Sequence, residues 1–208
     1  MRLYYHPIST NARRAVMTAH HLGIGLDLIP VDLANGEQRL PEFLDRNPNG
    51  RVPVLVDDDG YTLWESRAIM LYLASRTPGQ TLYPEDPHGR ADVHRWLFWC
   101  AVHFSPALGI FTWENFVKRL AGAGDPDPAE LKRGERLLGQ LAPVLDAHLA
   151  GRTWVAGDQL TLADLSLSPP LALTGPAAIP VTQYANLQAW FARVQELDAW
   201  KKTTPPRP

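Results

Sequence analysis

Residues 50–73, GRVPVLVDDDGYTLWESRAIMLYL, constrain the fold more than any other stretch of this chain. Two short runs of β-type residues, Val54–Val56 and Tyr61–Leu63, lie close together in it. Between them stands Asp59-Gly60, a dipeptide that strongly favours a tight hairpin turn. The stretch therefore predicts a β-hairpin, followed by a helix at Glu65–Ser75.

The two ends of this hairpin carry the residues most suited to binding. Val52-Pro53 stands just before the first run, and Glu65-Ser66 opens the helix that follows the second. The first turn of a helix offers free N–H groups and the positive end of the helix dipole, which favour a carboxylate. Read alone, Glu65 and Ser66 could be a simple helix cap, and Pro53 could be an ordinary trans proline at a strand edge.

The remaining residues up to position 76 alternate between strand and helix signals. We expect a strand at Arg2–Tyr5, a helix at Asn11–Leu22, a strand at Asp27–Leu33 and a short helix at Pro41–Arg46. Pro30 suits an edge strand, because proline cannot donate to a sheet hydrogen bond. This β-α-β order followed by β-β-α predicts an α/β thioredoxin-like domain at residues 1–76, with a mixed sheet between helices.

The second half of the chain is predicted to be all-α. Residues 77–87 form a linker rich in proline and glycine, and residues 88–208 form a helical domain. Apolar residues recur at helical spacing around residues 93–111, 137–149 and 187–197. Pro106 and Pro143 should interrupt the first two of these helices.

A short polar motif in this half predicts a helix N-terminus. Thr161 and Asp164 have the spacing of a capping box in its acidic variant, and Leu160 and Leu165 stand in hydrophobic-staple positions. The motif predicts a folding role, and we assign it no catalytic part.

Composition excludes several classes of partner. A net charge of −2 gives no reason to expect nucleic acid or an acidic membrane surface. No stretch approaches the roughly 18 uncharged apolar residues of a membrane span. Cys100 is the single cysteine, which rules out an internal disulfide and fits a reducing compartment. We therefore expect a cytoplasmic protein.

Taken together, NPNGRVPVLVDDDG, LWESRAIMLYLA and GDQLTLADLSL resemble the soluble glutathione S-transferase family, in a bacterial-looking form. The resemblance implies a thioredoxin-like domain followed by a helical domain, glutathione as co-substrate, no metal, and a detoxifying homodimer. It also implies that Pro53 is cis and that the backbone of Val52 binds the cysteinyl amide of glutathione. Glu65 and Ser66 would hold the γ-glutamyl end.

The thiol-activating residue is expected where the first strand ends. HPIS followed by ARR resembles the serine-type classes, phi and theta-like, which implies that the Ser9 hydroxyl donates a hydrogen bond to the glutathione sulfur. Ser9 could instead only cap the first helix, and the two roles are compatible. Thr10 and Asn11 are second choices, and Tyr5 is the alternative donor.

Beta-class enzymes have a cysteine at the position of Thr10, so a mixed-disulfide mechanism through that position is excluded. Other ligand contacts also follow from the resemblance. Gln38, Arg39 and Arg51 stand where related enzymes contact the glycyl carboxylate of glutathione, although solvated surface arginines are an equally good interpretation.

The resemblance implies that the electrophile binds between the Ser9 loop and the helix that runs from Val93 to Phe111. Most of such an aromatic stripe is normally core, so only two or three side chains should face a ligand. The candidates are Trp99, His103, Phe104, Phe111, Trp113 and Phe116.

Three functions remain open at this point. The first is transfer of glutathione to a small hydrophobic electrophile. The second is glutathione-dependent reduction of peroxides or disulfides, and the third is non-catalytic binding of glutathione or another ligand. A protein partner other than a second copy of the chain is not implied.

Overall fold

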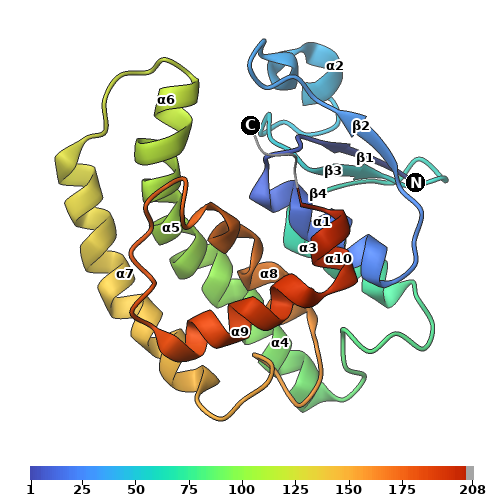
Figure 1. Ribbon diagram of the computed structural model, residues 1–208. Helices are drawn as coiled ribbons and strands as arrows, with labels where there is room; N and C mark the ends of the chain where they lie inside the picture. Colours follow the sequence, from blue (N-terminus) through green and yellow to red (C-terminus); the bar gives the residue numbers. More distant parts are fainter. Residues whose placement is uncertain (205–208) are drawn as a thin grey trace. The chain divides into compact units, whose positions relative to one another are not determined.

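A computed structural model describes residues 1–204, which form two compact units (Figure 1). The first unit contains Met1–Tyr83 together with the described residues from Leu197 onward, and the second contains Pro84–Glu196. The last helix among the described residues, α10 (Asp198–Lys202), therefore belongs to the first unit. The functional boundaries at residues 76 and 88 stay a prediction.

The first unit is built on a mixed four-stranded sheet in the order β2-β1-β3-β4. β1 pairs in parallel with β2 and antiparallel with β3, and β3 pairs antiparallel with β4. The strands are β1 (Arg2–Tyr5), β2 (Asp27–Pro30), β3 (Val54–Val56) and β4 (Thr62–Trp64). This confirms the thioredoxin-like pattern and the edge position of Pro30.

The second strand is shorter than predicted, because it ends at Pro30 and not at residue 33. The side chain of Asp32 accepts hydrogen bonds from the backbone N–H groups of Ala34 and Asn35, each at 3.1 Å. This local turn competes with the sheet for the backbone, as short acidic side chains commonly do.

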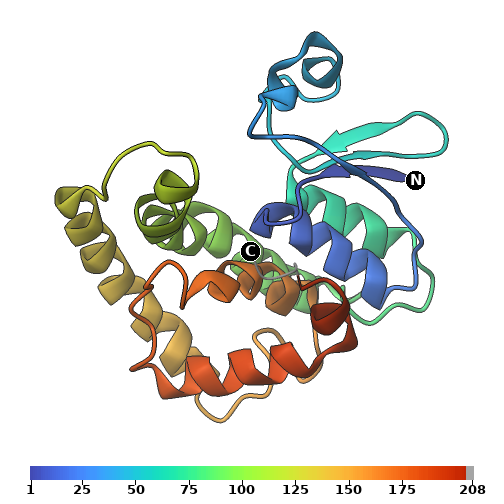
Figure 2. The ribbon, with the colours of Figure 1, turned by 45° about the horizontal axis from the view of Figure 1, so that its top comes forward.

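Helices cover both faces of this sheet (Figure 2). α1 (Thr10–His21) and α3 (Ser66–Ser75) lie on one face, where Leu3 and Tyr5 join their apolar cluster. On the other face Tyr4 packs with Phe43 of α2 (Pro41–Leu44), next to the short 3₁₀ helix η1 (Glu37–Arg39). Tyr4 and Tyr5 thus face opposite sides, as expected for consecutive strand residues.

The second unit, residues 84–196, contains helices joined by loops and no strand, which confirms the all-α prediction for these residues. Within residues 1–204, no helix is both long enough and apolar enough to cross a membrane. The elements of the second unit are α4 (Pro87–Trp99), the π-helical turn η2 (Cys100–Phe104), α5 (Ser105–Phe111), the π-helical turn η3 (Thr112–Val117), α6 (Lys118–Leu120), α7 (Pro128–Leu149), α8 (Leu162–Leu167), the 3₁₀ helix η4 (Pro169–Leu173) and α9 (Ala185–Glu196).

The two helix-internal prolines have different consequences. Before Pro106 the helix changes to the π-turn η2, which accommodates the residue that cannot donate an N–H, so the predicted interruption is confirmed. The predicted interruption at Pro143 is wrong, because α7 runs on to Leu149. Its face containing Leu138, Ala142 and Leu145 is buried, and this packing outweighs one missing hydrogen bond.

The predicted capping box is present at the start of α8 and is fully buried. The Thr161 side chain caps the helix, and the Asp164 carboxylate accepts the Thr161 N–H at 2.9 Å. Asp164 also accepts the N–H of Val155 at 2.9 Å and the indole N–H of Trp190 at 2.8 Å. This carboxylate therefore joins the start of α8, the preceding loop and α9.

We predict that Asp164→Ala lowers the free energy of unfolding by about 3 kcal/mol or more, because several buried donors lose their acceptor. Burial raises the pKa of Asp164 to about 6. Since this lies above the ordinary value near 4, the contribution of the carboxyl group to stability should decrease as the pH rises through about 6. The difference between the two proteins in urea unfolding should therefore narrow from about pH 4 to pH 7.

The exposed neighbour Asp158 provides the control, and Asp158→Ala should unfold like the unsubstituted chain. A loss at Asp164 no larger than the loss at Asp158 would contradict the structural role of the buried carboxylate.

Candidate functional site

Ser9 is the N-cap of α1, so the capping role considered from the sequence is confirmed. Its Oγ accepts the N–H of Ala12 at 3.2 Å, and the Ser9 carbonyl accepts the N–H of Arg13 at 2.9 Å. The side chain is half-buried at the positive end of a 12-residue helix. Within residues 1–204, the hydroxyl proton of Ser9 has no hydrogen-bond acceptor, so the cap leaves this group able to donate.

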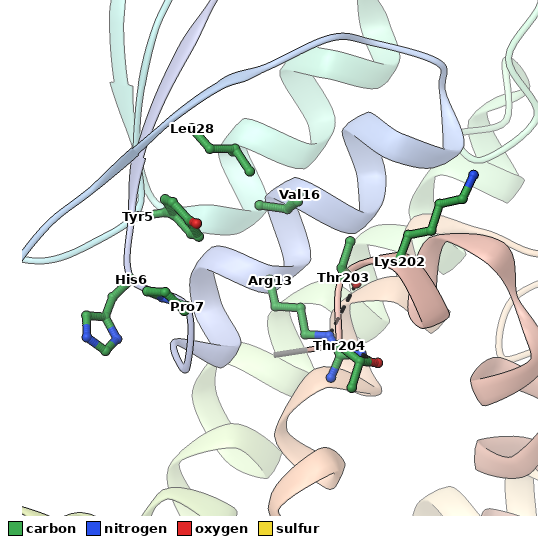
Figure 3. A pocket seen from close by; sticks show the side chains of 9 residues that line it. All are labelled: Tyr5, His6, Pro7, Arg13, Val16, Leu28, Lys202, Thr203 and Thr204. Carbon is green, nitrogen blue, oxygen red and sulfur yellow. Dashed lines mark hydrogen bonds between the residues drawn. The ribbon is translucent and has the colours of Figure 1, made fainter. Parts of the chain in front are cut away.

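The other sequence candidates near this turn have different surroundings. Thr10 is the first residue of α1 and half-buried. Asn11 is exposed, and its side-chain oxygen accepts from the guanidinium of Arg14. Tyr5 is half-buried on the α1 side of the sheet and lines a pocket together with Arg13 (Figure 3). Of these candidates, Ser9 combines a fixed position with a free O–H donor.

The Val52–Pro53 peptide bond is cis, which confirms the sequence-based expectation. The loop before it is held by Asn47, which is buried and was not identified from the sequence. Its side-chain N–H donates to the Arg51 carbonyl at 2.7 Å, and its oxygen accepts the Asn49 N–H at 3.0 Å. In the described part of the chain, neither the N–H nor the C=O of Val52 has a hydrogen-bond partner.

Asn47 could have been suspected from the Asn-Pro-Asn-Gly run at 47–50, since asparagine and glycine favour turns. The pattern predicts a turn but cannot tell which amide faces inward. Its role follows only from the burial and the hydrogen bond to Arg51.

Glu65 precedes α3 rather than lying in its first turn, which corrects the sequence-based expectation. The helix begins at Ser66, which is buried, whereas Glu65 is exposed and occupies φ +73°. A side chain at positive φ is uncommon and costs of the order of 1 kcal/mol or more. Such conformations are often found at functional sites, where the surrounding structure holds them in place.

The hairpin that leads to Glu65 is fixed by Asp57. This buried carboxylate accepts from the Tyr72 hydroxyl and from the Arg76 guanidinium, both on the α3 side. The hydrogen bond from Tyr72 is the main cause that holds the pKa of Asp57 below its usual range. The hairpin and the helix that carry Glu65 and Ser66 are therefore tied together.

The segment with Gln38 and Arg39 lies against the loop with Arg51. Gly50 has φ +58°, and a Cβ added there would lie 3.0 Å from the Gln38 carbonyl and 3.5 Å from an Arg39 guanidinium nitrogen. The fold thus brings these three predicted contacts to one region. Arg39 and Arg51 are exposed, while the buried Gln38 side-chain oxygen has no partner among the described residues.

The residues predicted to contact the electrophile all belong to the second unit, and they differ in how deeply they are buried. Phe104, Phe111 and Phe116 are buried in its core. Trp99 is half-buried, and His103 and Trp113 are exposed. The expectation that only part of this stripe can reach a ligand agrees with that division, and the ligand contacts themselves stay a prediction.

Comparisons with known proteins place these features in a family. The family "Glutathione S-transferase, N-terminal domain" matches residues 1–75, and "Glutathione S-transferase, C-terminal domain" matches residues 94–198. Together they span most of the chain. The sheet, the cis Pro53 and the Glu65-Ser66 helix start lie in the first match, and the buried capping box lies in the second.

Individual relatives cover almost the whole chain. "Glutathione S-transferase 3" of Zea mays is 34% identical over 208 residues, which are 98% of this chain and 92% of that protein. "Glutathione S-transferase F10" of Arabidopsis thaliana is 35% identical over 96% of this chain and 94% of that protein. The crystal structure of glutathione transferase F7 from Populus trichocarpa superposes with a TM-score of 0.89 at 32% identity, covering 97% of this chain and 96% of that one.

The chain belongs to the glutathione S-transferase family. It is an enzyme of that family, and glutathione is the family's co-substrate.

We predict that Glu65→Gly unfolds at a higher temperature than Glu65→Ala, because glycine adopts positive φ without steric cost. Thermal unfolding of the two variants measures the difference, expected to be about 1 kcal/mol. At exposed Glu85, whose φ is not positive, the same pair should show the opposite order. An alanine variant at 65 as stable as the glycine variant would contradict the strained conformation.

Proposed function

We propose that this chain is a serine-type transferase, close to the phi and theta-like classes, in which Ser9 activates the glutathione thiol. The observation that carries the proposal is the free hydroxyl donor of Ser9, fixed by its own cap at the N-terminus of α1. The relatives described above, whose names include F7 and F10, support this assignment of class.

The energy required for activation is within reach of one hydroxyl. A free thiol of the cysteine type has a pKa of about 8.5, so most of it is protonated at neutral pH. Lowering that pKa by one unit needs about 1.36 kcal/mol of preferential stabilisation of the thiolate. A hydrogen bond to a charged group contributes about 1.5–3 kcal/mol, so Ser9 can lower the pKa by one to two units.

The peptide part of glutathione would bind to groups that the fold leaves open. Val52 would pair its free N–H and C=O with the cysteinyl amide, as one extended strand pairs with another. Glu65 would hold the γ-glutamyl amine, and the Ser66 hydroxyl and the N-terminus of α3 its carboxylate. Arg39 and Arg51, with Gln38, would contact the glycyl carboxylate.

A ligand of this type is known in one structural relative. Glutathione S-transferase-I, 28% identical over 98% of this chain with a TM-score of 0.85, was solved with lactoylglutathione bound. This supports glutathione as the ligand of the residues around Val52 and Glu65.

The chemistry we propose is nucleophilic attack by the thiolate. The thiol releases its proton to solvent, the Ser9 O–H stabilises the sulfur anion, and the sulfur electron pair forms a C–S bond to an electrophilic carbon. The leaving group departs with its bonding electron pair. Trp99, His103 and Trp113 are accessible enough to contact a small hydrophobic electrophile, whereas Phe104, Phe111 and Phe116 would shape its site from within the core.

We predict that Ser9→Asp abolishes the thiolate band in the ultraviolet absorbance of bound glutathione while the fold stays stable. Aspartate is as good an N-cap as serine, but its carboxylate cannot donate and repels the sulfur anion. Ser9→Gly removes the hydroxyl at a cost of only a few tenths of a kcal/mol. Both variants should lower kcat/KM for conjugation of an aromatic halide by about tenfold or more.

Calorimetry of glutathione binding accompanies this experiment, because binding should persist in the glycine variant. A thiolate band that survives in both variants would overturn the role of Ser9 and direct attention to Tyr5, Thr10 or Asn11. Loss of binding in the unsubstituted protein would overturn the glutathione site as a whole.

We further propose that the chain forms a homodimer through exposed apolar side chains. On α4 and the adjoining turn, Phe98 is 68% and Val102 64% exposed, one helical turn apart. On the hairpin, Tyr61 and Trp64 are 49% and 40% exposed. Large exposed apolar side chains commonly mark an interface, and each unit carries such a pair.

We predict that Phe98→Glu shifts the sedimentation coefficient from that of a dimer to that of a monomer, because a buried interface does not tolerate an unpaired charge. Leu120→Glu, at an equally apolar residue that is 56% exposed on α6, is the matched control and should leave the coefficient unchanged. Identical sedimentation of all three proteins would contradict the interface.

A further inference from the structure

A cavity lies within the first unit, beside α1 and residues 202–204 (Figure 3). Its volume is about 170 Å³. The side chains that line it come from the end of β1 and the turn after it, from α1, from β2, and from the end of α10 and the two residues after it. They are Tyr5, His6, Pro7, Arg13, Val16, Leu28, Lys202, Thr203 and Thr204. We call it the Arg13 pocket.

Arg13 is the central polar group of this pocket, although it is only 6% exposed. Its Nη2 donates to the Trp200 carbonyl at 3.0 Å and to the Thr204 hydroxyl at 2.9 Å, and its Nε donates to the Thr203 hydroxyl at 3.3 Å. The guanidinium also lies 3.7 Å from the centroid of the Trp200 ring. The group is therefore held rigidly by neutral partners.

Within the part of the chain that the structure describes, no acidic group balances the charge of Arg13. Among residues 1–204, no carboxylate forms an ion pair with it, and its Nη1 has no hydrogen-bond acceptor. Burial lowers the pKa of Arg13 to about 10, which reflects the poor solvation of the cation. A buried charge is costly unless it is paired, and a guanidinium with free N–H groups is well suited to an anion.

The walls around this cation are mainly apolar. Val16, Leu28 and the Tyr5 ring lie on one side of the pocket, and Figure 3 shows Arg13 and Thr203 across from them. Lys202 does not supply a second free cation, since its ammonium pairs with Asp198 at 2.9 Å. A cavity of about 150 Å³ can hold benzene, so the Arg13 pocket has room for one aromatic ring.

We propose that the Arg13 pocket binds a small organic monoanion, one carboxylate attached to a body about the size of an aromatic ring. The carboxylate would accept from Nη1 of Arg13, and the ring would lie against Val16 and Leu28. Ser9, Val52, Glu65 and Ser66 are not among the residues that line this pocket, so the site is distinct from the proposed glutathione site. The inference does not rest on the function proposed above.

The experiment is calorimetric titration of the full chain with sodium benzoate and, separately, with benzyl alcohol as its neutral counterpart. S-hexylglutathione is present in excess so that glutathione and electrophile sites are occupied. We expect benzoate to bind at least about tenfold more tightly than benzyl alcohol, because only the anion neutralises Arg13. The preference should weaken as salt is added.

Two variants locate the binding. Leu28→Trp places a larger side chain at the wall of the pocket from an exposed strand edge, and Arg13→Lys keeps the charge but not the planar donor group. Each should weaken benzoate binding about tenfold or more. Leu120→Trp on α6, a second exposed leucine, is the control and should bind benzoate unchanged.

Equal affinity for benzoate and benzyl alcohol would overturn the proposal, as would benzoate binding that survives both Leu28→Trp and Arg13→Lys. Absence of any benzoate heat with the unsubstituted chain would overturn it as well. If Arg13→Lys fails to fold, the titration of Leu28→Trp still tests the proposal, because benzoate binding that is unchanged in this variant would overturn it.

Discussion

The hydrogen bond from the Ala12 N–H to the Ser9 Oγ is the interaction on which the proposed site depends. It starts α1 directly after β1, where the Ser9 N–H donates to the His6 carbonyl at 2.9 Å. Because the hydroxyl acts as an acceptor in the cap, its direction is set by the helix, while its proton stays available. A capping residue can thereby become a catalytic donor without an added element of structure.

The same division of hydrogen-bonding capacity recurs elsewhere in the first unit. Asn47 donates to the Arg51 carbonyl, while the N–H and C=O of the next residue, Val52, have no partner among residues 1–204. Arg13 donates through Nε and Nη2 to residues of the first unit, and its Nη1 has no acceptor in the described part of the chain. In each case part of a polar group fixes the geometry and the remainder can meet a ligand. This arrangement provides preorganisation, since little has to move when a ligand binds.

Much of this architecture could be predicted from local sequence signals. The Asp59-Gly60 turn, the strand at Arg2–Tyr5 and the Thr161–Asp164 capping box each depend on nearby residues, and the structure contains all three. The continuity of α7 through Pro143 could not be predicted, because it depends on burial against other helices. The role of Asn47, the positive φ of Glu65 and the packing of residues 200–204 against Arg13 likewise arise from contacts that no local pattern encodes.

The most direct test of the account is the pKa of the glutathione thiol in the bound state. It can be followed by the chemical shift of glutathione labelled with ¹³C at the cysteinyl Cβ, titrated with pH in complex with the protein. A stabilising hydrogen bond from Ser9 predicts a midpoint one to two units below the free value of about 8.5. A bound thiol that titrates at the free value would contradict thiolate stabilisation by Ser9.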